Sequence, residues 1–145
     1  NAPSFGFCVG QVKKIGWFVT AMSNFRFDAM NYSMVTDANG LVEGSYPGFT
    51  GSVLHSRVSV MGGLVVRVAG PVCFRLGAGY GSNITSQMAT NGNVVRISNY
   101  SYEGIDATAG IQMNLKGFTL TADAVTTNFK TLEAKVGLGY CWKRK

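Results

Sequence analysis

The last strand-like segment of the chain, residues 132–142, constrains the fold most, because its side chains alternate in character without a break. One face carries only apolar or aromatic residues, namely Leu132, Ala134, Val136, Leu138, Tyr140 and Trp142. The other face carries two opposite charges, two glycines and a cysteine. Successive side chains of a β-strand point to opposite sides of the sheet, so this segment predicts a strand with an apolar outside and a crowded polar inside. That combination is typical of a barrel that spans an outer membrane.

The composition agrees with such a barrel. The chain of 145 residues is 46% hydrophobic and 14% charged, which is apolar for a soluble domain. It has no run of about 18 apolar residues, so no transmembrane helix is expected. A membrane barrel shows only every second residue to lipid, which spreads the apolar residues in this way. We therefore expect residues 1–145 to form one transmembrane barrel domain.

Six earlier segments share this alternation and complete an all-β, antiparallel up-and-down transmembrane barrel. The seven expected strands are residues 4–11, 17–27, 55–68, 72–82, 105–115, 118–124 and 132–142. Tight turns at 13–16, 69–71 and 116–117 alternate with long loops at 28–54 and 83–101 and a short loop at 127–130. We expect a small hairpin around Asn39-Gly40 and a strand extension at residues 94–97.

The alternation of tight turns and longer loops predicts orientation and closure. Outer-membrane barrels have short periplasmic turns and longer external loops, which places the C-terminus in the periplasm. Seven strands are an odd number, whereas bacterial single-chain barrels have an even number. An unpaired strand edge in hydrocarbon costs several kcal/mol per orphaned group. We therefore expect an eighth strand, from an upstream part of the polypeptide or from a partner chain, so that residues 1–145 lack the first strand.

Several segments resemble small eight-stranded barrels of the OmpA/OmpX type, and more closely the barrel modules of Bacteroidota outer-membrane proteins. The similar segments are residues 4–7, 12–19, 77–82, 128–130 and 133–139. They cover strands and turns but not the long loops. The resemblance implies the fold, an outer-membrane location and an additional strand before residue 4; it supplies no catalytic residues.

Charged residues recur on the predicted inner face. They are Arg57, Arg67, Arg75, Asp106, Asp123, Glu133 and Lys135. Buried charges must be paired, so we expect an ion-pair network that fills the bore. A gated ion path or a proton relay is the alternative. Glycines on the same face make room for the arginine side chains.

The outer face predicts contact with lipid. The residues in the middle of their strands on this face are Val60, Leu64, Leu76, Ile111, Leu120 and Val136. Aromatic residues near strand ends are expected to lie at the membrane interfaces; they are Trp17, Phe118, Tyr140 and Trp142.

Other chemistry is weakly indicated. His55 is the one histidine, with Ser56 beside it and Asp37 in the preceding loop. A rim site for acyl transfer or proteolysis is conceivable, but a polar rim residue is favoured. No spacing of cysteine and histidine suggests a metal site, and no cofactor is expected. The cysteines Cys8, Cys73 and Cys141 fall on the polar face, and we expect free, buried thiols. A Cys73–Cys141 disulfide is the alternative, and it requires their Cα atoms to approach within about 7 Å.

We therefore expect a non-enzymatic outer-membrane barrel that serves as an anchor or accessory subunit of a larger envelope complex. Its expected partners are membrane lipid and another outer-membrane protein. Its scattered basic residues do not indicate nucleic acid, and no small-molecule substrate is identified. The alternatives are a soluble lipocalin-like carrier of an apolar ligand and an outer-membrane enzyme that uses His55.

Overall fold

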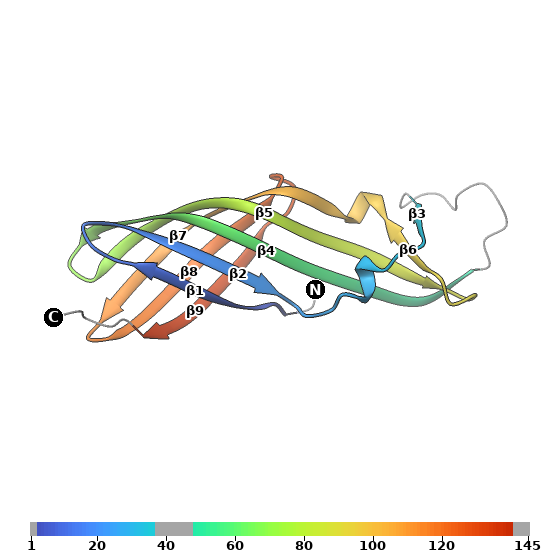
Figure 1. The fold of residues 1–145 in the computed structure, drawn as a ribbon, viewed down its shortest axis with the longest axis horizontal. Coiled ribbons are helices and arrows are strands. Elements are labelled where there is room, and N and C mark those ends of the chain that lie inside the picture. Colours follow the sequence, from blue (N-terminus) through green and yellow to red (C-terminus); the bar gives the residue numbers. More distant parts are fainter. Residues whose placement is uncertain (1–2, 37–47, 141–145) are drawn as a thin grey trace.

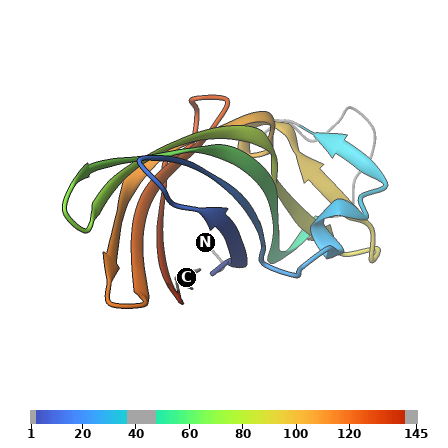
Figure 2. The same ribbon diagram turned by 60° about the vertical axis from the view of Figure 1, so that its left-hand side comes forward.

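The computed structural model describes residues 3–36 and 48–140, and this part of the chain folds into one curled antiparallel sheet (Figures 1 and 2). Seven strands follow one another around the curl in the order β1-β2-β4-β5-β7-β8-β9. Their bounds are β1 Phe5–Gln11, β2 Ile15–Ser23, β4 Phe49–Ala69, β5 Val72–Ala89, β7 Tyr102–Leu115, β8 Phe118–Thr127 and β9 Glu133–Tyr140. The seven expected strands are confirmed, and the sheet forms an open half-barrel.

The sheet has two free edges, β1 and β9. Each other strand of the path pairs with a neighbour on both sides, whereas β1 pairs only with β2 and β9 only with β8. No backbone pairing joins the two edge strands within residues 3–36 and 48–140. Figure 2 shows the curl with its opening between the β1 and β9 edges. The expectation of a closing strand therefore stays a prediction.

Two strands extend beyond the others at the loop end, where a long loop was expected. β4 begins at Phe49 and β5 continues to Ala89, so the segments expected as loops at 28–54 and 83–101 are partly strand (Figure 1). Strand β6 (Val94–Ile97) pairs with the end of β5, which confirms the expected extension, and β3 (Met34–Thr36) pairs parallel to β6. The hairpin expected around Asn39-Gly40 lies outside the described residues.

Two short 3-10 turns, η1 (Asp28–Met30) and η2 (Ser98–Tyr100), complete the loop end. The Ser86 hydroxyl on β5 donates to the Ala29 carbonyl at 2.8 Å, which holds η1 against the projecting hairpin. In the described part of the chain no helix is long and apolar enough to cross a membrane.

The interior of the curl is built around Phe18 and two glycines. The Phe18 ring is 2% exposed and lies against β4 and β5. A Cβ at Gly77 would lie 2.7 Å from the Cζ atom of Phe18, and one at Gly63 would lie 2.7 Å from its Cε1 atom. Both distances are too short for carbon atoms, so only glycine leaves room for the ring at these positions. The alternation of small and large inner residues thus packs the bore.

We predict that Phe18→Ala lowers the free energy of unfolding by about 3–5 kcal/mol, because it leaves a cavity over the two glycines. The neighbouring Val19 points outward and is 45% exposed, so Val19→Ala is a matched control with an expected loss below about 1 kcal/mol. Equilibrium urea unfolding of the refolded protein measures both. Equal losses for the two variants would contradict this account of the interior.

Candidate functional site

Six charged side chains from five strands meet inside the half-barrel, and Arg57 is their centre. Its Nη2 atom lies 2.8 Å from Asp106 Oδ2, and its Nε atom lies 3.1 Å from Glu133 Oε2. Arg57 is on β4, Asp106 on β7 and Glu133 on β9. One guanidinium therefore connects three strands across the interior.

Asp106 is the most completely satisfied carboxylate of this group. Its residue is 0% exposed. Besides Arg57, it accepts hydrogen bonds from the hydroxyls of Ser59 and, at 2.6 Å, of Thr127. A Cβ at Gly81 would run into this carboxylate, so the glycine makes the space that the side chain occupies. A buried charge is tolerated only with such pairing and hydrogen bonding.

Arg75 and Asp123 form a second pair toward the tight-turn end. Arg75 Nη1 lies 3.4 Å from Asp123 Oδ2, and both side chains are almost fully buried. The Arg75 guanidinium also stacks 4.2 Å from the Phe18 ring centroid and lies 3.4 Å from the Cys8 Sγ atom. Neither Asp123 oxygen accepts a hydrogen bond from a described group, so charge alone holds this pair. Its geometry is weaker than that at Asp106.

Lys135 and Asn83 link the edge strand β9 to the rest of the curl. The Lys135 ammonium donates to the Thr20 hydroxyl on β2 at 2.8 Å, and the Asn83 amide on β5 donates to Glu133 at 3.3 Å. Side chains therefore cross the interior between strands that are far apart in the sheet order. These contacts hold the open sheet in its curled form.

Of the seven charged residues expected in the network, Arg67 does not join it. It is exposed beside the β4–β5 turn, where the pairing register shifts between Arg67 and Ala69. Among the described residues it takes part in no ion pair. Alternation along the strand assigned Arg67 to the inner face. It did not show that the enclosed interior ends before β4 reaches Arg67.

The structure adds hydroxyl, amide and aromatic groups that the sequence did not place in the network. They are Phe18, Thr20, Ser59, Asn83 and Thr127. Ser59 stands two residues from Arg57 in the predicted strand 55–68, so the alternation puts it on the same inner face. What was missing was the register between strands, which decides which inner residues stand opposite one another.

The residues expected to face lipid all lie on the outer, convex face. Val60, Leu64, Leu76, Ile111, Leu120 and Val136 are between 42% and 74% exposed. The expected interfacial residues Trp17, Phe118 and Tyr140 are exposed as well. The Phe118 and Tyr140 rings meet edge to face, 6.2 Å apart, at the tight-turn end. Trp142 lies outside the described residues.

His55 has no catalytic partner in the described part of the chain. Its Nδ1 atom lies 3.1 Å from the Thr85 hydroxyl. The side-chain amide of Asn24 donates to the His55 carbonyl and accepts from the Arg57 N–H. Ser56 is 0% exposed, so its hydroxyl does not reach a substrate at the surface. Asp37 lies outside the described residues. Within residues 3–36 and 48–140, no group of three His, Cys, Asp or Glu residues is placed to hold a metal.

The cysteines differ from one another in exposure. Cys73 is a free, fully buried thiol near the Asn114 amide, as expected. Cys8 is free but exposed, so the expectation of a buried thiol is wrong there. Its strand β1 is an edge of the sheet, and the contact with Arg75 leaves the thiol exposed. Cys141 lies outside the described residues.

A cavity of about 460 Å³ opens at the loop end between the two sheet edges. Its lining includes Ser4 near the start of β1, His55 and Arg57 on β4, and Glu133 and Lys135 on β9. The cavity therefore lies where the first and last strands of the curl fail to meet. Its polar wall belongs to the ion-pair network.

We predict that Asp106→Ala lowers the free energy of unfolding by about 3–5 kcal/mol, because it leaves Arg57 and two hydroxyls without their shared acceptor. Glu133→Ala removes the other carboxylate of Arg57, but its side chain is 31% exposed, so we expect a loss of at most about 1 kcal/mol. Urea unfolding of the two variants measures the difference. A larger loss of stability for Glu133→Ala than for Asp106→Ala would contradict the central role of Asp106 in the network.

Comparisons of the chain with protein-family models, with curated proteins and with solved structures find no match. The resemblance to OmpA/OmpX-type barrels thus stays an expectation from the sequence, and the chain is described by its fold: an antiparallel sheet curled into a half-barrel.

Proposed function

We propose that this chain is the membrane-spanning part of a bacterial outer-membrane protein, and that it acts without enzymatic activity as an anchor or accessory subunit of an envelope complex. One observation carries the proposal: the middle of the exposed face is apolar, while Arg57, Arg75, Asp106 and Asp123 are buried inside the half-barrel. A water-soluble protein has the opposite arrangement. A barrel in lipid needs an apolar exterior and satisfies its polar groups internally.

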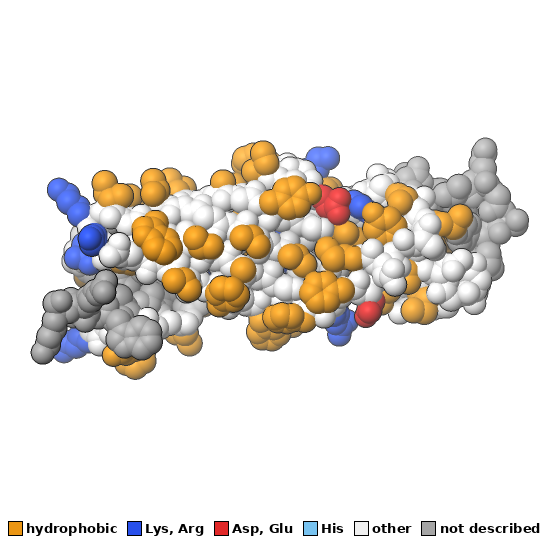
Figure 3. Space-filling view, viewed as in Figure 1, with side chains coloured by type: hydrophobic (Ala, Val, Ile, Leu, Met, Phe, Trp, Pro, Cys, Tyr) orange, Lys and Arg blue, Asp and Glu red, His pale blue; other side chains and the backbone are white. Residues whose placement is uncertain are grey.

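The distribution of charge along the molecule also supports an exterior that faces lipid. Figure 3 shows apolar side chains over the middle of one face, with Lys and Arg at the tight-turn end and charges of both signs toward the loop end. The cations beside the tight turns are Lys13, Lys14, Arg67 and Lys116, all exposed. A central band without charges between two charged rims is the expected exterior of a membrane barrel.

The interior argues against the soluble-carrier alternative. A lipocalin-like carrier needs an apolar cavity inside the barrel for its ligand. Here Arg57, Arg75, Asp106 and Asp123 are each at most 5% exposed and fill that space. The same filling argues against a wide aqueous pore. The enzyme alternative rests on His55, whose partner among the described side chains is a threonine hydroxyl.

Membrane insertion also requires that the two free edges be paired. Each unpaired backbone group in hydrocarbon costs several kcal/mol, so β1 and β9 are not stable as lipid-exposed edges. We propose that one further strand, from a segment that precedes β1 in the polypeptide, pairs with both. Such a strand also covers Cys8 and the cavity at the loop end. An anchor role then follows for whatever domain this segment connects to the barrel.

Envelope fractionation of cells that make the full polypeptide tests the proposal. We expect the protein to sediment with the outer membrane, to resist alkaline carbonate and to require detergent for extraction. An antibody to this module detects it in each fraction. Recovery in the soluble fraction without detergent would refute the membrane proposal.

We predict that Leu64→Arg destabilises the folded protein by about 2–4 kcal/mol, because Leu64 lies in the middle of the apolar band, where a charge meets hydrocarbon. Val68→Arg is the matched control on the same face of β4, beside the charged tight-turn rim, with an expected cost of about 0–1 kcal/mol. Unfolding in lipid vesicles measures both. If Leu64→Arg is as stable as wild type, the outer face meets water instead of lipid, since exposed surface changes are nearly neutral there.

A further inference from the structure

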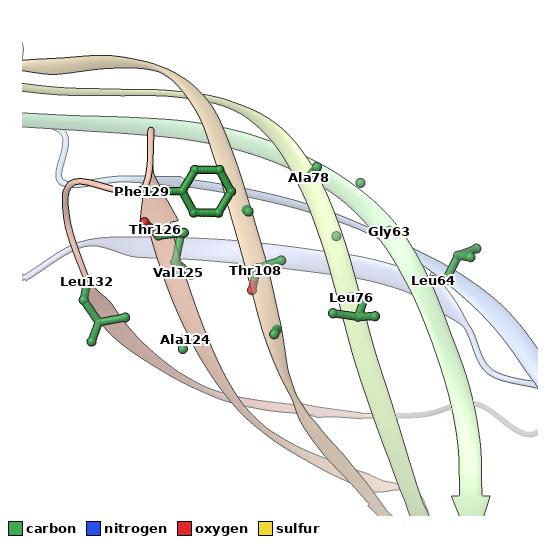
Figure 4. A pocket seen from close by; sticks show the side chains of 14 residues that line it. Gly63, Leu64, Leu76, Ala78, Thr108, Ala124, Val125, Thr126, Phe129 and Leu132 are labelled. Carbon is green, nitrogen blue, oxygen red and sulfur yellow. The ribbon is translucent and has the colours of Figure 1, made fainter.

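An apolar groove crosses the outer face of the half-barrel and ends at the turn between β8 and β9 (Figure 4). Its volume is about 590 Å³. The lining residues come from β4, β5, β7 and β8 and from the turn. Apart from the hydroxyls of Thr108 and Thr126, the side chains that line it carry no polar group. The groove is thus a recess in the face that the proposed function assigns to lipid.

The floor of the groove is a row of small side chains that stand in register on neighbouring strands. Gly62 pairs with Ala78, and Ala78 pairs with Ala107. The next outward row toward the tight turns carries Leu64 opposite Leu76 on β4 and β5, and continues as Ala109 opposite Ala124 on β7 and β8. The row on the other side carries Val60 opposite Tyr80, and Tyr80 opposite Ile105. On β4 and β5 the recess is therefore one row of small residues between two rows of large ones, and on β7 and β8 it widens over the two alanines of the next row.

The far end of the groove is walled by Phe129 and Leu132, each 82% exposed. The turn holds Asn128 and Phe129 at φ of 49° and 57°, a left-handed conformation that is uncommon for these residues. The Asn128 amide donates to the Glu103 carbonyl at 2.6 Å and accepts from the Ile105 N–H at 3.1 Å, which fastens the turn to β7. Figure 4 shows Phe129 beside Thr126 and Val125, with Leu132 across the strand.

The dimensions of the groove favour a hydrocarbon chain over a protein helix. Five strands at about 4.8 Å spacing give a length of about 19 Å from β4 to β9. On β4 and β5 the two rows of large side chains stand four residues apart, about 13 Å before their own width is subtracted. An α-helix with its side chains is about 10–12 Å wide and does not fit between them. A single acyl chain does.

A cation stands at the end of the groove. Lys130 follows Phe129 directly and is the one charged residue in the segment 127–132. It is exposed, and its Nζ atom lies 5.8 Å from the centroid of the Tyr102 ring. At a membrane surface such a cation attracts an anionic headgroup. The apolar groove and this charge are thus complementary to the two parts of one anionic lipid.

We propose that the outer wall binds one acyl chain of an anionic membrane lipid in this groove, with the lipid headgroup beside Lys130. The inference rests on the proposed membrane location. It adds a specific lipid site to a face that otherwise meets lipid without selection. The floor residues Ala78 and Ala107 define where the acyl chain lies, and Lys130 defines which lipid headgroups are preferred.

Photo-crosslinking in vesicles tests the site. The full polypeptide is reconstituted in phosphatidylethanolamine vesicles that contain phosphatidylglycerol with a diazirine on one acyl chain, and labelled peptides are mapped by mass spectrometry. We expect labels to concentrate on the peptides that contain Ala78, Ala107 and Phe129. Ala78→Phe fills the groove and should reduce this labelling about tenfold, which corresponds to about 1.4 kcal/mol. Ala122→Phe, at an exposed outer position of β8 outside the groove, is the matched control and should leave it unchanged.

The headgroup is tested with the same diazirine lipid carrying phosphocholine. We expect weaker labelling of the groove by this zwitterionic probe, and loss of the preference for phosphatidylglycerol in Lys130→Gln. Equal labelling by both probes would overturn the headgroup assignment. Labels spread evenly over the outer face, or equally reduced by Ala78→Phe and Ala122→Phe, would overturn the groove.

The two proposals fail in different ways. A protein that inserts into vesicles and fractionates with membranes but shows only evenly spread labels refutes the groove alone. A protein that needs no membrane at all refutes the proposed function. In cells, a photoreactive p-benzoylphenylalanine placed at Ala107 that captures a polypeptide instead of lipid would also overturn the lipid proposal, because a protein would then cover the wall.

Discussion

The burial of opposite charges inside the curl is the interaction on which the rest of the structure depends. Backbone pairing gives a twisted sheet with two free edges, and it brings charged side chains from several strands to one inner face, where they need partners. Arg57 reaches Asp106 and Glu133 on strands far along the sheet, and Lys135 reaches back to Thr20. These contacts need the strands to face one another across the interior, so they form only in the curled sheet.

Most of the fold was predictable from the sequence, because the period of a strand is a local property. Alternation identified seven strands and assigned residues such as Leu64 and Arg75 to opposite faces, independently of any tertiary contact. Interstrand register is not local, so the pairing of Arg57 with Asp106, and the position of Phe18 over Gly63 and Gly77, became visible only in the structure. The projecting part of β4 was missed because glycine, proline and asparagine between residues 39 and 51 indicated a loop.

The small residues on the two faces have different roles. Inside, Gly63, Gly77 and Gly81 give space to groups that must be buried, an aromatic ring and a carboxylate. Outside, Gly62 is free of such contacts, since a Cβ there would meet nothing closer than the Phe18 carbonyl at 3.8 Å. Because Gly62 has no side chain, the outer surface is recessed at this position. The alternation in the sequence does not distinguish these two roles, because a glycine's role depends on which face of the sheet it occupies.

The direction of the two edge strands limits how the half-barrel can close. Neighbours along the seven-strand path are antiparallel, so the first and the seventh, β1 and β9, run the same way. Direct closure would make a parallel seam in an otherwise antiparallel wall. Two copies related by an axis along the strand direction would also meet with parallel edges. Only an odd number of inserted strands keeps every neighbour antiparallel.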